Sequence, residues 1–199
     1  MESIREFRGR NDRRLFLSGY SRGGLVAINV AKRLEEEFGP DDIEVVCLAL
    51  FDAVDRQVGL AGETIPGNVR YACHAVRDSR AGSRSYFGHC GLRSARGPEA
   101  LEVHPFFGTH AALGGLPWEG DHPVHVRVTG VGVAEAVGGI ALAAMGVANP
   151  LAVQQSIPLF QAAAANLSEP DITKQEDEAA SAAVWAWMSA KARARGMLG

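Results

Sequence analysis

The stretch of sequence that decides the fold is Leu15-Phe16-Leu17-Ser18-Gly19-Tyr20-Ser21-Arg22-Gly23-Gly24, near the start of a 199-residue chain. Its apolar run, residues 15–18, predicts a short buried strand. Residues 22–37 read as a helix, because apolar residues recur every four positions along one face. The members of that stripe are Val26, Val30 and Leu34. The segment therefore predicts a strand, a tight turn at Ser21 and a helix, in that order.

Three further apolar runs predict strands that follow this unit. Residues 43–51 are almost unbroken in their apolar character, as in a strand covered on both faces. Residues 69–76 and 101–107 are the next two candidates, and the loop between them, residues 79–98, is rich in Arg, Ser and Gly. Residues 124–128 form a weaker candidate for a strand or hairpin arm, because valines alternate there with polar residues.

A clear helical pattern returns at the C-terminus. Thr173 and Glu176 form a capping box, and an apolar stripe follows it. The stripe consists of Ala180, Ala183, Val184, Trp187 and Met188. We therefore predict an α/β fold with a mostly parallel sheet and flanking helices. Residues 1–170 form its domain, and residues 171–199 add an amphipathic helix packed on the same domain.

Composition and charge exclude several classes of function. The chain is 47% hydrophobic, its net charge is −3, and it has no basic stripe with interleaved aromatic residues, so we expect no nucleic-acid partner. The apolar residues 136–148 are too few for a confident membrane span. Three cysteines without CxxC spacing are typical of reduced thiols. Because the N-terminus lacks an apolar signal region, we expect a cytoplasmic protein, or one exported without a cleavable signal peptide.

The residues around the predicted turn carry the chemistry. Gly19-Tyr20-Ser21-Arg22-Gly23 is a G-x-S-x-G motif between a strand and a helix, the context in which a serine is held on a sharp turn as a nucleophile. We expect Gly19 and Gly23 to leave room where side chains would collide. The backbone N–H of Arg22, at the start of the helix, would face the oxyanion that forms during attack.

A nucleophilic serine needs a base and an acid, and in folds with this turn they follow it in the order acid, then histidine. His110 follows a strand candidate and every candidate acid, so we predict it as the base. Asp52 and Asp78 both stand at strand ends, and either suits the acid. Among the other histidines, His74 reads as a packed core residue. His89, His104, His122 and His125 lack a convincing partner pattern, and we predict no metal site because His122 and His125 would be two ligands without a third.

Over residues 11–115 the sequence resembles an uncharacterised α/β-hydrolase domain family that includes the phospholipase effectors of bacterial type VI secretion. Four blocks carry the resemblance. The family's elbow, G-D-x-I-x-L-x-G-F-S-R-G-A, is similar to residues 11–24, and its W-D-T-V is similar to residues 51–54. Its H-A-L-A-L-D-E-x-R-x-x-F is similar to residues 74–80, with one residue fewer between His and Asp. Its F-x-G-x-H-S-D-V-G-G is similar to residues 107–115.

The resemblance implies a serine hydrolase of carboxylic esters that needs no cofactor, forms an acyl-enzyme intermediate and acts on lipid or phospholipid acyl esters. Ser21 and His110 carry over directly as members of its catalytic triad. The resemblance favours Asp52 as the acid, because its block keeps the family's Asp and Val, and leaves Asp78 as the alternative. Ala112 and Ser79 replace acidic residues of the pattern. A lipid substrate also implies peripheral contact with a membrane.

Only about 14 residues precede the first predicted strand, whereas a complete α/β hydrolase has several strands before its elbow. We therefore expect the C-terminal part of that fold, without the early strands and without the loop that supplies the second oxyanion N–H. The strand at residues 15–18 would be an open edge, which favours self-association or a partner chain. The alternative function is a truncated or degenerate module that acts in binding and has no activity of its own.

Overall fold

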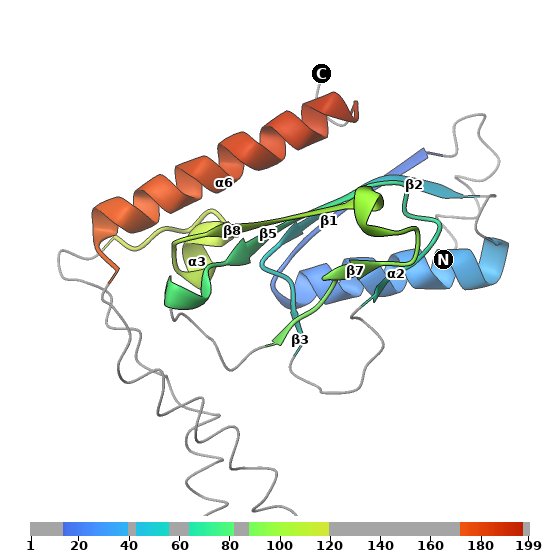
Figure 1. Cartoon of the computed structure of the whole chain (residues 1–199), viewed down its shortest axis with the longest axis horizontal. Helices are drawn as coiled ribbons and strands as arrows, with labels where there is room; N and C mark the ends of the chain where they lie inside the picture. Colours follow the sequence, from blue (N-terminus) through green and yellow to red (C-terminus); the bar gives the residue numbers. More distant parts are fainter. Residues whose placement is uncertain (1–13, 40–42, 56–63, 82–87, 120–171, 197–199) are drawn as a thin grey trace, which may run out of the picture.

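The computed structural model describes residues 14–39, 43–55, 64–81, 88–119 and 172–196 (Figure 1). Its main sheet has four parallel strands in the order β1-β2-β5-β8. They are β1 (Arg14–Tyr20), β2 (Glu44–Phe51), β5 (Ala72–Arg77) and β8 (Leu101–Phe106). Helices α2 (Arg22–Phe38) and α6 (Lys174–Ala194) lie on opposite sides of the sheet (Figure 1). The predicted α/β class, with a mostly parallel sheet and flanking helices, is confirmed.

Short elements connect the long ones. β3 (Val54–Asp55) pairs with β6 (Gly88–His89) in an antiparallel ladder, and β4 (Thr64–Ile65) pairs with β7 (Arg93–Ser94) in a parallel one. Two 3₁₀ turns lie at Ser79–Ala81 and Pro98–Ala100, and helix α3 spans His110–Leu113. The β3–β6 pair ties the end of β2 to the predicted loop of residues 79–98. The predicted strand at 124–128 and the apolar residues 136–148 lie outside the described residues.

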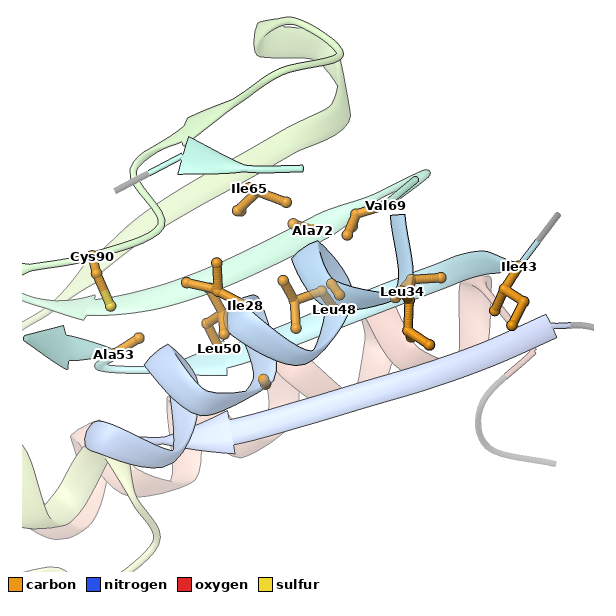
Figure 2. Close-up of a cluster of buried hydrophobic side chains, with 13 residues drawn as sticks. Ile28, Leu34, Ile43, Leu48, Leu50, Ala53, Ile65, Val69, Ala72 and Cys90 are labelled. Atoms are coloured by element: carbon orange, nitrogen blue, oxygen red, sulfur yellow. The ribbon is translucent and has the colours of Figure 1, made fainter. Parts of the chain in front are cut away.

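One hydrophobic core fills the space between α2 and the sheet (Figure 2). Ile28 and Leu34 of the helix meet Leu48 and Leu50 of β2, and all four side chains are fully buried. The predicted stripe of α2 is wrong at Val26, which is 59% exposed. The buried face consists instead of Gly24, Ala27, Ile28, Ala31 and Leu34. Small residues on this face let the helix approach the neighbouring residues closely: a Cβ at Gly24 would lie 2.4 Å from the Cβ of Ala53.

A second core lies on the other face of the sheet, under α6. Val184 and Met188 pack there against Cys73, Phe106 and Leu113. The predicted capping box is present at the start of α6, with both of its reciprocal hydrogen bonds. Within the part of the chain that the structure describes, no helix is long and apolar enough to cross a membrane. Helix α6 packs on the sheet through this second core.

The α2 face offers a matched test of this packing. We expect Leu34→Ala to lower the free energy of unfolding by about 2–5 kcal/mol, because it leaves a cavity at a fully buried position. Val26→Ala lies on the same helix but faces solvent, so its effect stays within about 0.5 kcal/mol. Urea unfolding followed by circular dichroism measures both values. Equal losses would contradict the burial of Leu34 and the exposure of Val26.

Candidate active site

Ser21 sits on the turn between β1 and α2 in a conformation that few non-glycine residues adopt. Its φ is 56°, in the left-handed region, where an L side chain is strained. The backbone holds this shape: the Ser21 N–H donates to the Phe51 carbonyl at 3.0 Å, and the Ser21 carbonyl accepts from the N–H of Val54 at 3.2 Å. These two hydrogen bonds link Ser21 to the last residue of β2 and to the first residue of β3.

Of the two glycines predicted to leave room around Ser21, only Gly19 has that role. A Cβ atom at Gly19 would stand 2.3 Å from the Gly23 carbonyl oxygen, so Gly19 is required by close contact. The prediction for Gly23 is wrong, because a Cβ there would meet no atom within 4 Å. The crowded position is Gly24, where a Cβ would lie 2.4 Å from the Cβ of Ala53. The orientation of α2 that exposes Val26 also places Gly24, and not Gly23, against the segment that contains Ala53.

A continuous chain of hydrogen bonds joins three of the predicted site residues. The His110 Nε2 lies 2.9 Å from the Ser21 Oγ, and the His110 Nδ1 lies 2.5 Å from the Asp52 Oδ2. Asp52 follows β2 and His110 begins α3, just after β8. Because β1, β2 and β8 are parallel, the residues that follow them meet at one edge of the sheet.

The alternative acid, Asp78, has a different partner. Its carboxylate is paired with the guanidinium of Arg80 and also accepts the Arg80 backbone N–H at 2.9 Å. Hydrogen bonds from Arg80 lower the pKa of Asp78 to about 2. Between the two candidate acids, the one hydrogen-bonded to the histidine ring is therefore Asp52.

Asp52 has no exposed surface and is surrounded by donors. Besides His110, the Arg77 Nε lies 2.8 Å from Oδ2, the Arg77 backbone N–H donates to Oδ1 at 3.3 Å, and the His89 Nε2 lies 2.8 Å from Oδ1. Burial alone would raise the pKa of Asp52, but these donors and the guanidinium charge outweigh it and hold the pKa well below that of an exposed aspartate. The carboxylate is thereby kept ionised.

His89 and Arg77 were not predicted as site residues. His89 comes to Asp52 through the ladder between β3 and β6, in which it stands opposite Val54. Arg77 is the last residue of β5, the strand next to β2, and its side chain is only 4% exposed. An arginine that ends a buried strand was the available signal, since such a charge requires a partner.

Three successive backbone N–H groups, those of residues 52–54, each donate a hydrogen bond that holds the chain in place. Asp52 itself has a φ of 44°, and its N–H donates to the Ala75 carbonyl at 2.7 Å. The Ala53 N–H donates to the Nε2 of His74 at 2.9 Å, and the Val54 N–H reaches Ser21. His74 is fully buried, as the sequence suggests, and desolvation is the main cause that lowers its pKa to about 4. It therefore serves as a neutral acceptor that holds the backbone beside the acid.

Tyr20, the residue before the serine, also contacts the histidine. Its ring stacks on the His110 ring with centroids 4.8 Å apart, and its hydroxyl donates to the His110 carbonyl at 3.0 Å. A Cβ at Gly114 would stand 2.6 Å from the Tyr20 ring, so this glycine lets the tyrosine lie close. Next to Tyr20 is a hollow of about 490 Å³ between β1 and α6. Its apolar walls include Leu113, Val184 and Trp185.

Two further features bear on what the site can do. The backbone N–H of Arg22 is among the first of α2, which have no carbonyl of the helix to bind, so it is available to a negative charge beside Ser21. Among the residues that the structure describes, no group of three metal-ligating side chains comes together. His122 and His125 lie outside the described ranges. The arrangement offers a serine hydroxyl, a histidine that can take its proton and a buried carboxylate that orients the histidine.

Comparison with known proteins adds no assignment. The sequence matches no protein-family model, and a search of the curated proteins gives no significant match.

The two helix glycines give a direct test of the turn. Gly24→Ala should lower the free energy of unfolding by about 1–3 kcal/mol, because its methyl group would collide with Ala53. Gly23→Ala should be neutral or stabilise the protein by up to about 1 kcal/mol, since alanine favours helix and finds open space there. Chemical denaturation of the two variants measures the difference, and the opposite order would refute the packing described here.

Stability should depend on the protonation of His74. Its pKa is about 4 in the folded protein against an ordinary value of 6.5, so between these pH values the unfolded chain binds a proton that the folded one does not. The resulting stability is complete above pH 6.5 and is lost as the pH falls toward 4, by roughly 3 kcal/mol. Urea titrations at several pH values should show this fall in the parent and a smaller one in His74→Gln. His104→Gln, in an exposed part of β8, serves as the control for replacing a histidine with glutamine.

Proposed function

We propose that the protein is a serine hydrolase of carboxylic esters, with Ser21 as nucleophile, His110 as general base and acid, and Asp52 as the orienting carboxylate. The observation that carries this proposal is the unbroken path of hydrogen bonds from Asp52 through His110 to a serine held at a positive φ. Serine alone is a weak nucleophile, and this arrangement supplies what activates it.

The reaction follows from the positions of these groups. The His110 Nε2 removes the proton of the Ser21 hydroxyl while the oxygen attacks the carbonyl carbon of the ester. The negative charge on the carbonyl oxygen is met by the N–H of Arg22. His110 then gives the proton to the departing alcohol oxygen, which leaves an acyl group on Ser21. Water, deprotonated by His110 in turn, attacks the carbonyl carbon of this acyl-enzyme. The bond from that carbon to the Ser21 Oγ then breaks, the serine oxygen takes the proton back from His110, and the carboxylic acid leaves. Asp52 stays ionised throughout and holds the histidine ring.

Two observations support a finer assignment to the α/β-hydrolase fold. The serine turn follows a parallel strand at the carboxyl edge of the sheet and leads directly into a helix, which is the setting of the nucleophile in that fold. The acid and the histidine follow later strands in the order expected for it. The resemblance of residues 11–115 to an uncharacterised α/β-hydrolase domain family, which includes type VI secretion phospholipase effectors, agrees with this assignment.

The substrate we propose is an ester with an apolar acyl group, such as a lipid or phospholipid. The hollow between β1 and α6 supports this choice, because Tyr20 lies on its wall and also stacks on His110. Its other apolar walls would cover a hydrocarbon chain near the reacting serine.

Labelling with a fluorophosphonate probe tests the mechanism, because the probe reacts with an activated serine and not with an ordinary one. We expect the parent chain to be labelled at Ser21, and Ser21→Ala to lose both labelling and hydrolysis of p-nitrophenyl esters. Asp52→Asn should reduce kcat by about 10⁴-fold, since the histidine loses the group that fixes its tautomer.

Asp78→Asn is the matched control, because this aspartate ends the neighbouring strand but is paired with Arg80. It should leave hydrolysis nearly unchanged. A larger loss at Asp78 than at Asp52 would move the acid, and activity of Ser21→Ala close to that of the parent would end the proposal.

One observation favours a second function, that of an interaction module. Among the described strands, β1 lies at the edge of the sheet, and its side chains are only partly buried. Such an edge can pair with another strand. If the parent is not labelled but associates with itself or with a partner chain, binding becomes the better account of this fold.

A further inference from the structure

Asp177, in the first turns of α6, is a fully buried carboxylate that the reaction described above does not use. It accepts three hydrogen bonds from the loop around His110. The Thr109 N–H donates to Oδ1 at 2.6 Å, the Thr109 hydroxyl donates to Oδ2 at 2.9 Å, and the Trp118 N–H donates to Oδ2 at 2.8 Å. Both carboxylate oxygens are thus engaged by groups 59 and 68 residues away in the chain.

These donors enclose the segment that carries the histidine. Thr109 immediately precedes His110 and is the N-cap of α3, since its hydroxyl oxygen accepts the Ala112 N–H at 3.1 Å. Trp118 comes five residues after the end of α3. By binding Thr109 before the helix and Trp118 after it, the carboxylate of Asp177 holds the segment that presents the ring of His110.

The contact between α6 and this loop is close as well as polar. A Cβ at Gly108 would lie 2.5 Å from the Cβ of Ala180, one turn after Asp177 on α6. Leu113, at the end of α3, packs in the same core as Val184 and Met188 of α6. The loop therefore has little freedom to shift while α6 stays in place.

We propose that Asp177 is a positioning residue of the active site, which holds the Thr109–His110 segment so that the imidazole lies between Asp52 and Ser21. This inference rests on the proposed function. It gives one residue of α6, a helix beyond the span of the family resemblance, a role in positioning the active site. Asp177 itself touches neither the serine nor the substrate, and it acts through Thr109.

The chemistry of the carboxylate makes the proposal testable by a small change. Asp177→Asn keeps the size of the side chain but replaces one acceptor oxygen with an NH₂ donor. In the parent, all three partners donate hydrogen bonds to the carboxylate. The NH₂ group that the substitution introduces would therefore face at least one of these donors with its own N–H. We expect the loop to move enough to slow the reaction. A displacement of about 1 Å at a reacting group costs about 10²-fold.

The experiment compares the rate of fluorophosphonate labelling at Ser21 with the protonation pattern of the His110 ring. The pattern is read from long-range ¹H–¹⁵N spectra, which show which ring nitrogen carries the proton. We expect Asp177→Asn to reduce the labelling rate about 10–100-fold without weakening reversible binding of the probe. It should also remove the single protonated Nδ1 state that the bond to Asp52 requires. Glu178→Gln, on the exposed side of the same helix, should behave as the parent in both readouts.

Thr109 supplies a second route to the same answer. Thr109→Val should reproduce the effect of Asp177→Asn, and Thr109→Ser, which keeps the hydroxyl, should recover most of the lost rate. If Asp177→Asn fails to fold, this pair of variants decides the question. The two changes combined should cost less than the sum of the two single losses, because Thr109 and Asp177 share a hydrogen bond.

The proposal is overturned if Asp177→Asn is folded, is labelled at the parental rate and shows the parental ring spectrum. If the parent itself is not labelled, the proposed function fails. The ring spectrum then still decides: an altered His110 pattern in Asp177→Asn supports positioning by Asp177, and an unaltered one refutes it.

Discussion

The buried negative charge of Asp52 is the constraint on which the rest of the site depends. A carboxylate without contact with water is stable only if donors surround it, and removing one partner from such a group costs about 3–5 kcal/mol. The donors arrive from three places: the end of β5 with Arg77, the short ladder of β6 with His89, and α3 with His110. Folding that satisfies the charge therefore also assembles the chain of hydrogen bonds that ends at Ser21.

The parts of this structure that the sequence could predict are those governed by neighbouring residues. The strand, turn and helix around Ser21 follow from an apolar run, a glycine pattern and a helical period, all within about 25 residues. Asp52 and His110 could be identified as candidates in the sequence for a similar reason. Asp52 directly follows β2 and His110 comes four residues after the end of β8, and the ends of parallel strands meet at one edge whatever the details of packing. Asp78 follows a strand as well, so the strand ends alone left both acids open, and the family resemblance favoured Asp52.

What the sequence could not predict depends on register and rotation. His89 reaches Asp52 only because β6 pairs with β3 with that residue opposite Val54, and a loop composition does not contain this register. The apolar stripe of the helix that carries Asp177 could be predicted from the sequence. The partners of its carboxylate could not, because they lie 59 and 68 residues away in the chain. The exchange of roles between Gly23 and Gly24 has the same origin, since a rotation of α2 by one residue changes which atom faces Ala53.

The sequence separations within the site have a consequence for how the protein folds. β1, α2 and β2 are consecutive elements and can form early, because their closure requires loops of modest length. The bond between His110 and Ser21 joins residues 89 apart, and the contact of Thr109 with α6 joins residues 68 apart. Closing such long loops is entropically slower than forming a helix. During refolding, helical signal should thus return before the serine becomes reactive, so that reactivity reports the last stage of folding and secondary structure an earlier one.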